Sequence, residues 1–505
     1  MNLDPDVCYR AIQTRDARFD GRLFVAVRTT GIYCRPVCPA RTPLRQNVTF
    51  HASAASAQEA GYRACLRCRP ETSPQLGAWN GASNTVSRAL ALIEAGALDE
   101  GDVETLAERV GVGGRQLRRL FLQHIGATPV GVAQTRRVLL AKQLIHETDL
   151  PMGEVALAAG FGSVRRFNET FQQLYDRPPA ALRRRKALPS SHKAPPGEAI
   201  SLTLRYRPPY DWDAMLAFLA MRAIPGVEVV ESNTYRRVIA LDGAVGTIAV
   251  RPIDDDRLSV AVRFPRPSAL PRILARVRGV FDLSADPVGI GEVLARDPDL
   301  ARMVALRPGL RVPGAWDGFE LAVRAILGQQ ITVVQARKLA GDLVAAHGAP
   351  LAEGWAEPGL THAFPSAERL AVADLSAMKM PGARIRCLSG IAAAIAADPN
   401  LLAPTASLDE MVKRLRALPG IGEWTAQYIA MRQLREPDAF PAADVALMRA
   451  LADADGVRPT ADQLLARAEA WRPWRAYAAL HLWASLADEG APPIRAQARK
   501  VKRAA

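Results

Sequence analysis

The sequence lacks any apolar run long enough to cross a bilayer, and its first residues do not form a signal peptide. We therefore expect no membrane partner and an intracellular protein. Acidic residues are also fewer than basic ones. The chain has 51 Asp and Glu against 65 Lys and Arg, which gives a net charge of +14 over 505 residues. This excess favours a polyanionic partner. The hydrophobic fraction of 49% is ordinary for globular cores, and the length predicts three or four domains.

Cysteines are few, and four of the six fall into two close pairs. Cys34 and Cys38 form a C-x3-C pair, whereas Cys65 and Cys68 form a C-x2-C pair. In a reducing compartment such pairs indicate metal ligands before disulfides. Two pairs of thiols can complete a tetrahedral site, so we expect one Zn²⁺ held by these four residues. Four unrelated buried thiols are the alternative.

Positive charge is concentrated in residues 109–186, which hold 14 Lys and Arg against 5 Asp and Glu. The helical spacing of apolar residues breaks at Gly111 and again at 160–162, and it resumes after each break. We expect two helix-turn-helix units joined by a long helix over about 129–146. The second helix of each unit would face the major groove, where arginine suits guanine edges. The candidate DNA-binding residues are Arg115, Arg118, Arg165 and Arg166.

A turn between two helical patterns stands out near the C-terminal end, at Pro419-Gly420-Ile421-Gly422. We expect Gly420 and Gly422 to provide positive φ angles and to leave the next helix with free N–H groups. Such a helix start suits a phosphate oxygen. Downstream, Asp444 opens another apolar segment. A carboxylate repels DNA, so its presence there indicates chemistry that develops positive charge.

The hairpin, Trp424, Tyr428 and Asp444 resemble the helix-hairpin-helix superfamily of DNA glycosylases, in its AlkA-type 3-methyladenine DNA glycosylase II branch. Residues 24–41, F-V-A-V-R-T-T-G-I-Y-C-R-P-V-C-P-A-R, are similar to the N-terminal domain of Ada, and the paired helix-turn-helix units resemble the AraC type. Four further blocks carry the glycosylase resemblance: R-P-P-Y-D-W at 207–212, R-P-G-L-R-V-P-G at 307–314, R-A-I-L-G-Q-Q at 324–330 and W-R-P-W-R-A-Y-A-A-L-H-L-W at 471–483.

These resemblances imply two reactive groups. The Cys34 thiolate would accept a methyl group from a DNA methylphosphotriester, with Arg41 and Arg63 near the phosphate backbone. Asp444 would stabilise an oxocarbenium ion or activate water, and the residues alone leave both roles open. The flipped base would lie among aromatic rings. Those pocket residues are Phe218, Trp424, Tyr428 and Trp483, and Gln330 stands at the wedge position, where the family has an apolar Leu.

Three features of the family's relatives are missing. Trp424 stands where bifunctional glycosylase/lyases carry a Schiff-base lysine, so we expect a monofunctional enzyme. After Cys68 the chain has only Cys387, which excludes a four-cysteine iron–sulfur loop. The Pro-Cys-His-Arg tetrapeptide of a second methyltransferase domain is absent, so direct O6-methylguanine repair is not expected.

The expected fold is multidomain and mainly α. The predicted order is an α/β zinc domain at 1–75, a helical double helix-turn-helix domain at 84–186, a linker at 187–200, an α+β subdomain with an antiparallel sheet at 201–285, and a helix-hairpin-helix core at 286–495. The resemblance implies a glycosylase that also senses methylation and activates transcription, with damaged DNA, promoter DNA and RNA polymerase as partners, in the bacterial cytoplasm at the nucleoid. The alternative is a regulatory sensor whose glycosylase half binds DNA without catalysis.

Overall fold

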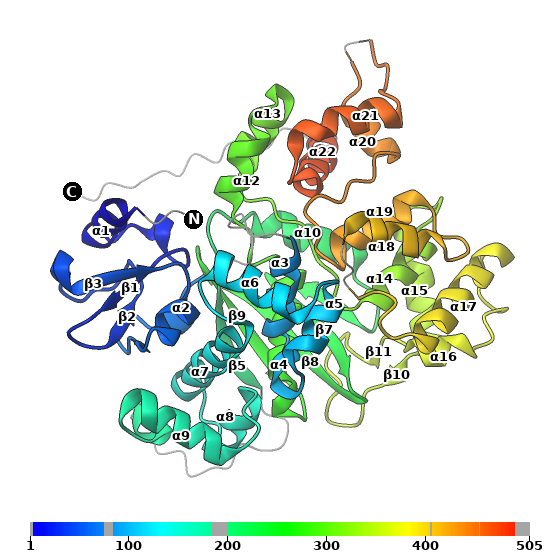
Figure 1. The fold of residues 1–505 in the computed structure, drawn as a ribbon. Helices are drawn as coiled ribbons and strands as arrows, with labels where there is room; N and C mark the ends of the chain where they lie inside the picture. The colour runs from blue at the N-terminus through cyan, green and yellow to red at the C-terminus, as the bar shows by residue number, and fades with distance from the viewer. Residues whose placement is uncertain (1–3, 75–83, 184–198, 404–406, 454, 490–505) are drawn as a thin grey trace, which may run out of the picture.

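The computed structural model describes residues 4–74, 84–183, 199–403, 407–453 and 455–489, and four modules follow one another along them (Figure 1). Most of the expected linker at 187–200 and the stretch after 489 lie outside the described residues. The fold is multidomain, with many helices and two larger sheets, as the sequence predicted. Among the described residues, no helix combines the length and the apolar character that crossing a membrane requires.

The first module is a small sheet of four strands in the order β3-β1-β2-β4, with two helices. Strands β2 and β4 run parallel and pair Ile32 with Arg63 and Tyr33 with Ala64. Their C-terminal ends therefore lie side by side, which brings the two cysteine pairs together. The elements are α1 (Pro5–Gln13), β1 (Phe24–Val27), β2 (Ile32–Cys34), β3 (Val48–His51), α2 (Ala54–Glu59) and β4 (Arg63–Ala64).

The second module is helical, and its helices begin and end close to where the apolar pattern predicted. The breaks at Gly111 and at 160–162 separate α5 from α6 and α8 from α9. Ser163 caps α9, because its side chain accepts a hydrogen bond from the Arg166 N–H. The helices are α3 (Asn84–Glu94), α4 (Ala97–Glu100), α5 (Val103–Arg109), α6 (Gly114–Ile125), α7 (Pro129–Glu147), α8 (Met152–Ala158) and α9 (Val164–Tyr175).

The third module is a five-stranded antiparallel sheet in the order β5-β9-β8-β7-β6, which confirms the expected α+β subdomain. Apolar residues alternate along β9, so one face of the strand is buried. Helices α10 and α11 pack against the sheet. The elements are β5 (Ile200–Arg205), α10 (Trp212–Arg222), β6 (Glu228–Glu231), β7 (Thr234–Leu241), β8 (Ala244–Asp254), β9 (Arg257–Arg263) and α11 (Leu270–Val280).

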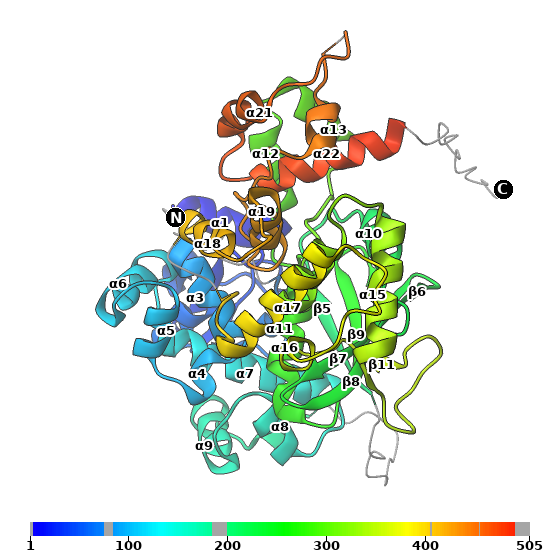
Figure 2. The same cartoon turned by 90° about the vertical axis from the view of Figure 1, so that its right-hand side faces the viewer.

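The fourth module has two helical lobes, each around its own core, and α19 lies between them (Figure 2). This helix gives Ala426 and Ile429 to one core and Ala430 and Met431 to the other. The main helices are α12 (Pro287–Leu294), α13 (Pro298–Leu306), α14 (Gly318–Leu327), α15 (Val333–His347), α16 (Ala367–Ala371), α17 (Gly382–Ala397), α18 (Leu408–Arg416), α19 (Glu423–Arg432), α20 (Val445–Ala450), α21 (Ala461–Ala468) and α22 (Arg475–Glu489).

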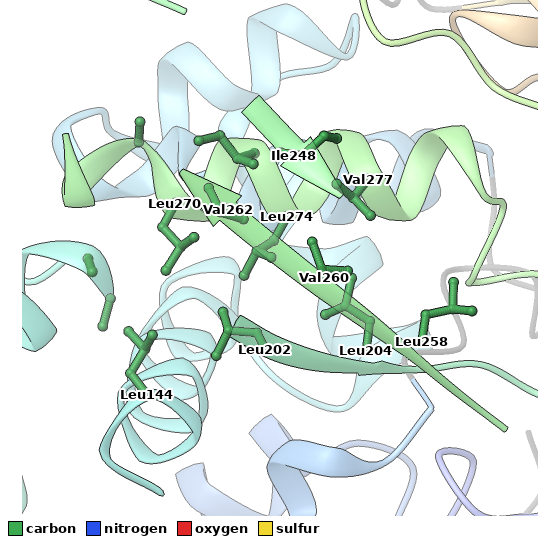
Figure 3. Packing of buried hydrophobic residues seen from close by; sticks show 14 of the residues in the cluster. Leu144, Leu202, Leu204, Ile248, Leu258, Val260, Val262, Leu270, Leu274 and Val277 are labelled. Carbon is green, nitrogen blue, oxygen red and sulfur yellow. The ribbon is translucent and has the colours of Figure 1, made fainter. Parts of the chain in front are cut away.

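The second and third modules share one hydrophobic core, which the sequence did not reveal. Leu144 of α7 packs with Leu202 of β5 and with Leu274 of α11 in a single buried cluster (Figure 3). All three side chains are at most 5% exposed. At roughly 25 cal/mol per Å² of buried apolar surface, such a core makes separation of the two modules costly.

Helix α7 also covers the open edge of the five-stranded sheet, where β5 has β9 as its only strand neighbour among the described residues. The Gln143 side chain donates to the Thr203 carbonyl at 2.7 Å, and the Thr203 N–H donates to the Glu147 carboxylate at 2.9 Å. Two side chains of a helix thus replace a neighbouring strand, and they satisfy backbone groups that an edge leaves unpaired.

On another side, α7 contacts the first module. Its Leu139 packs against the core around Tyr33, and its Lys142 ammonium donates to the Glu71 carboxylate at 2.8 Å. The Lys142 and Glu71 side chains are 0% and 1% exposed. Arg69 donates to both Glu71 and Glu147, so the first module, α7 and β5 form one polar junction.

We expect Lys142→Met to lower the free energy of unfolding by about 3 kcal/mol, because it leaves the buried Glu71 carboxylate with Arg69 as its remaining cation. A matched control is Arg165→Met. It removes an equally short ion pair to Glu169, but both of its side chains are more than half exposed, so the cost should be at most about 0.5 kcal/mol. Thermal unfolding of both variants measures the difference, and equal shifts would show that the buried pair does not hold the modules together.

Candidate functional site

The four paired cysteines meet at one point. Their Sγ atoms all lie within 4.8 Å of one another, as four ligands of one tetrahedral zinc ion must. Cys34 ends β2 and Cys65 follows β4, so the parallel pairing of these two strands sets the spacing. Zinc has no demanding electronic geometry and prefers thiolates, so these residues fit Zn²⁺ as the sequence predicted.

Backbone donors surround these sulfur atoms. The Arg35 N–H points at Cys68 Sγ at 3.4 Å, and the Arg67 N–H points at Cys65 Sγ at 3.3 Å. Such N–H groups reduce the negative charge on thiolates. The Arg35 side chain is 7% exposed, pairs with Asp20 and donates to the Cys68 carbonyl, so it holds both ligand loops. Sequence reasoning missed Arg35, although its position directly after a predicted ligand was a usable signal.

The two cysteine pairs differ in residue burial, although all four ligand positions of the cluster are buried. Cys34 and Cys38 are half-buried, whereas Cys65 and Cys68 are buried. Arg41 is exposed nearby in sequence. Arg63 is half-buried, and its guanidinium lies 5.7 Å from the ring centroid of Tyr175 on α9, so a contact between Arg63 and DNA stays a prediction.

Helices α6 and α9 expose the side chains that were expected to face DNA, namely Arg115, Arg118, Arg165 and Arg166. Their opposite faces bury aromatic residues such as Phe121 and Phe167. Arg118 pairs with Glu104 and Arg165 with Glu169 on the surface. Exposed ion pairs are weak, so a DNA phosphate can replace the carboxylate. Which of these arginines read bases stays a prediction.

The hairpin turn joins α18 to α19. Gly420 has a φ of +83°, as expected, and a Cβ there would lie 2.5 Å from the Cys387 sulfur. The expectation for Gly422 is wrong, because it has a φ of −85° and caps α19 in extended conformation. Its Cβ would meet no atom within 4 Å. Because Gly422 has no side chain, the first N–H groups of α19 have no side-chain cap.

Gln330 lies at the tip of the loop between α14 and α15. It is exposed and has a φ of +58°, a conformation that non-glycine residues seldom adopt. Its neighbour Gln329 donates through Nε2 to the Gly420 carbonyl at 3.1 Å. The wedge loop and the hairpin turn therefore form one surface. Gln329 was not a candidate from sequence, since a lone glutamine carries no signal.

Asp444 caps α20, and four N–H groups surround its carboxylate. Oδ1 accepts from the Ala446 and Leu447 N–H groups at 2.9 and 3.0 Å. The Trp424 indole N–H donates to Oδ2 at 2.6 Å, and the Trp483 indole N–H donates to Oδ1 at 3.2 Å. Both tryptophans were expected only as pocket walls. Because an indole N–H is always a donor, the two rings also fix the direction of the carboxylate.

The four expected aromatic residues line one cavity of about 770 Å³, which also includes Asp444. Trp424 and Tyr428 are one helical turn apart on α19 and stack with centroids 5.0 Å apart at an interplanar angle of 10°. No base fits between these two rings, so a bound base must use their outer faces or lie against Phe218 or Trp483. The structure thus brings together the residues that the sequence selected.

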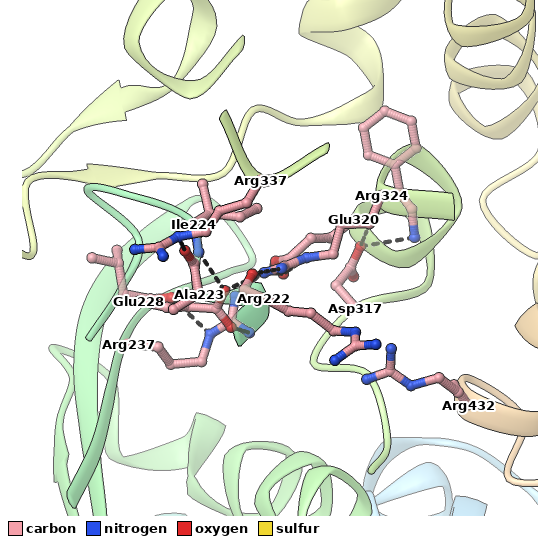
Figure 4. Close-up of polar contacts among 12 residues, drawn as sticks. Arg222, Ala223, Ile224, Glu228, Arg237, Asp317, Glu320, Arg324, Arg337 and Arg432 are labelled. Carbon is pink, nitrogen blue, oxygen red and sulfur yellow. Dashed lines mark hydrogen bonds and ion pairs between the residues drawn. The ribbon is translucent and has the colours of Figure 1, made fainter. Parts of the chain in front are cut away.

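The cavity also contains arginines that sequence reasoning missed (Figure 4). Arg222 follows Phe218 by four residues, and Arg432 follows Tyr428 by four, so this helical spacing was the available signal. The Arg432 guanidinium donates to the Tyr428 hydroxyl at 2.6 Å. Burial alone would raise the pKa of the Tyr428 phenol, but the nearby guanidinium groups of Arg432 and Arg222 outweigh it and bring this pKa below its usual value.

Three family models match the chain. They are the metal binding domain of Ada over residues 7–71, a helix-turn-helix domain over 106–185 and the AlkA N-terminal domain over 201–317. Their order along the chain agrees with the expected order of the first three modules.

Individual known proteins match either nearly the whole chain or its glycosylase part. The chain is 43% identical over 486 residues to the "Probable bifunctional transcriptional activator/DNA repair enzyme AlkA" of Mycobacterium tuberculosis, covering 96% of this chain and 97% of that protein. It is 35% identical over 285 residues to "DNA-3-methyladenine glycosylase 2" of Escherichia coli, covering 56% of this chain and 96% of that protein. A solved 3-methyladenine DNA-glycosylase from Archaeoglobus fulgidus aligns with a TM-score of 0.51 and 21% identity over 57% of this chain and 99% of that chain, which shows a shared fold.

We expect Gly420→Ala to destabilise the fourth module by about 2–4 kcal/mol, because alanine disfavours positive φ and its methyl group would contact Cys387. Gly422→Ala should cost only about 0.5–1 kcal/mol, the difference between glycine and alanine at an N-cap. Urea unfolding compares the two variants. In a Cys387→Ala background the cost at Gly420 should shrink, since the nearest atom is removed; an unchanged cost would contradict the proposed clash.

Proposed function

The chain belongs to the family of bifunctional transcriptional activator/DNA repair proteins that join an Ada-type metal-binding module, a helix-turn-helix module and an AlkA-type glycosylase, and we propose that it excises alkylated bases of the 3-methyladenine type from DNA. The observation that carries this proposal is the Asp444 carboxylate, which two indole N–H groups hold at the wall of a cavity large enough for a flipped base.

DNA would bind across the hairpin and the wedge loop. The first N–H groups of α19 have no side-chain cap, and they can donate to a backbone phosphate. Gln330 reaches out from the adjacent loop, which Gln329 ties to the turn, so it can fill the space that a flipped nucleotide leaves. Glutamine gains less than leucine from stacking with bases. Binding at the hairpin therefore has to supply more of the cost of flipping than in relatives with the apolar wedge.

Bond cleavage would depend on Asp444. As the C1′–N bond breaks, the electron pair leaves with the base, and positive charge grows on the sugar. The fixed carboxylate can stabilise that charge, or it can take a proton from the attacking water, and both roles place it beside C1′. Among the described residues that line the cavity there is no lysine, so no Schiff base can form there and the proposed reaction is simple hydrolysis.

The first module would accept one methyl group. The four cysteines would hold Zn²⁺, which would keep their thiolates deprotonated at neutral pH. Cys34, a half-buried residue of the cluster, would attack the methyl carbon of a methylphosphotriester. An S–C bond forms, the O–C bond breaks, and the phosphodiester leaves as an anion. The product is a thioether, so each chain reacts once.

Methyl transfer would also act as a switch for transcription. Four thiolates outweigh the two charges of Zn²⁺, and methylation of Cys34 removes one negative charge from a surface that faces DNA. At about 4–6 Å and an effective dielectric near 20 each charge pair is worth a few kcal/mol before screening, and about 1.4 kcal/mol already raises affinity tenfold. Helices α6 and α9 would then hold promoter DNA, with RNA polymerase as the partner, at the nucleoid in the cytoplasm.

We expect Asp444→Asn to lose excision of 3-methyladenine by about 10²-fold or more while it keeps or tightens binding to DNA, because the change removes a negative charge and the stabilising carboxylate together. Base release from methylated DNA and DNA binding are measured side by side on the full chain. Near-normal excision would remove Asp444 from this role. Wild-type protein that binds methylated DNA and releases no base would instead favour a sensor without catalysis.

Borohydride reduction during turnover provides a second readout of the same reaction. Since none of the described residues that line the cavity is a lysine, no covalent adduct between protein and DNA should be trapped. A trapped adduct would contradict simple hydrolysis and assign lyase activity to the protein.

We expect the full chain to gain one methyl group from DNA that carries methylphosphotriesters, and Cys34→Ala to gain none. Cys387→Ala is a suitable control, because it also removes a buried thiol but lies outside the zinc site. Mass spectrometry of the intact chain detects the transfer. Promoter affinity before and after the reaction, at two salt concentrations, then tests the switch, and methyl uptake by Cys34→Ala would contradict it.

A further inference from the structure

A second cavity, of about 260 Å³, lies where the first three modules meet. Among the described residues it shares no lining residue with the cavity that contains Asp444. Ser53 lines it from the first module, Leu90 from α3, Leu139 from α7 and Leu274 from α11. Helix α3 contacts both α7 and α11, so segments far apart in the chain enclose one space (Figure 2). A single buried water needs only roughly 30 Å³, so this space suits a larger occupant.

Apolar side chains form much of the lining. Phe24, Ile93 and Leu274 come from three different modules, and each is at most 5% exposed. Water gains nothing against such surfaces, whereas an apolar group that replaces water there is stabilised by the area it buries. The cavity therefore favours an occupant with an apolar body.

Polar groups without partners line the same cavity. Thr135 is 4% exposed, and its hydroxyl has no hydrogen-bond partner among the described residues. The Arg136 side chain is 9% exposed, and it donates to Asp99 through Nη2 only, so that Nε and Nη1 have no partner there. Nearly all buried donors in folded proteins are paired, because leaving one unpaired costs free energy. These groups point to an occupant that accepts hydrogen bonds.

Arg278 of α11 is the third polar group without a partner. It is half-buried in the lining, and no hydrogen bond or ion pair joins it to another described residue. Burial lowers the pKa of Arg278, and it raises that of Glu94, the carboxyl nearest in charge, against the attraction of Arg278. Both directions are those of ionisable groups that lack a close counter-ion.

Positive charge exceeds negative charge around the cavity. Arg136 and Arg137 share one carboxylate, that of Asp99. The Glu71 carboxylate, which also lines the cavity, is already paired with Lys142 and Arg69. The described carboxylates therefore leave Arg278 and part of the charge of Arg136 without compensation, and an anion suits this space better than a neutral molecule.

We propose that this cavity is a binding site for a small organic anion, a carboxylate on an apolar body, which joins the first three modules. Arg278 binds the carboxylate through two parallel N–H groups, the pairing that guanidinium and carboxylate groups favour. Thr135 and Arg136 donate to the remaining lone pairs, and the apolar body packs against Ile93 and Leu274. A ligand held between modules binds only their assembled arrangement, so it opposes their separation.

Thermal unfolding of the full chain tests the site with five probes: hexanoate, benzoate, their neutral amides hexanamide and benzamide, and acetate. Hexanoate or benzoate should raise Tm in a saturable way and bind at least about tenfold more tightly than its own amide, because the amide lacks the charge. Acetate lacks the apolar body and should leave Tm unchanged. Isothermal titration calorimetry gives each Kd. If neither carboxylate binds more tightly than its amide, the cavity belongs to water or to a segment of the chain itself, and the anion site is refuted.

Variants of α11 locate the bound anion. Arg278→Gln should weaken carboxylate binding at least about tenfold. The matched control is Arg272→Gln on the same helix, because Arg272 pairs with Asp242 at the surface and does not line the cavity, so Kd should stay unchanged. Ala275→Leu fills the cavity while Arg278 stays, and it should abolish the response of Tm. Equal affinity in the wild type and in Arg278→Gln would assign the anion to the basic surface and overturn the proposal, whereas excision of alkylated bases would be untouched by that result.

Discussion

The ammonium group of Lys142 has no contact with solvent, and it lies opposite an equally buried carboxylate, that of Glu71. Either charge would be costly to bury without the other, so the first module and α7 must stay together. Helix α7 buries residues on several of its sides, with polar side chains such as Lys142 and Gln143 among them. Leu139 faces the first module, Ala133 faces the first helix-turn-helix unit, and Leu144 faces the glycosylase sheet.

A second constraint applies at the cavity proposed for catalysis, where one carboxylate has two roles. Asp444 begins α20 as its N-cap, and it is also the group proposed to act on the sugar. The indoles of Trp424 and Trp483 hold it from the other side. These donors fix its direction before DNA binds, and preorganised groups of this kind need no rearrangement as charge develops. The cost is that the carboxylate and the two aromatic walls cannot vary independently.

Sequence patterns located most elements, because they rest on local physics. The breaks at Gly111 and at 160–162 and the turn at Gly420 are set by residues a few positions apart. The zinc ligands and the aromatic pocket were found from spacing and from resemblance. What escaped prediction depends on contacts between distant segments.

Three examples show this limit. Gly422 was expected to share the conformation of Gly420, but the capping geometry of α19 decided otherwise. The arginines of the cavity follow predicted aromatics at helical spacing, yet only the fold shows that they stack on Phe218. The common core of α7, β5 and α11 joins residues that lie about 130 positions apart, and no local pattern reports such a contact.

The hydrogen bonds of Gln143 and Glu147 to Thr203 have a consequence for synthesis on the ribosome. A nascent glycosylase sheet whose first strand had an open edge could recruit strands from neighbouring chains and aggregate. Here the helix that covers this edge precedes the strand in the chain, so it has already left the exit tunnel when β5 emerges. Helix α7 can therefore cover the edge of β5 as soon as this strand emerges. This requires the helix-turn-helix module to precede the glycosylase sheet in the chain, as it does here.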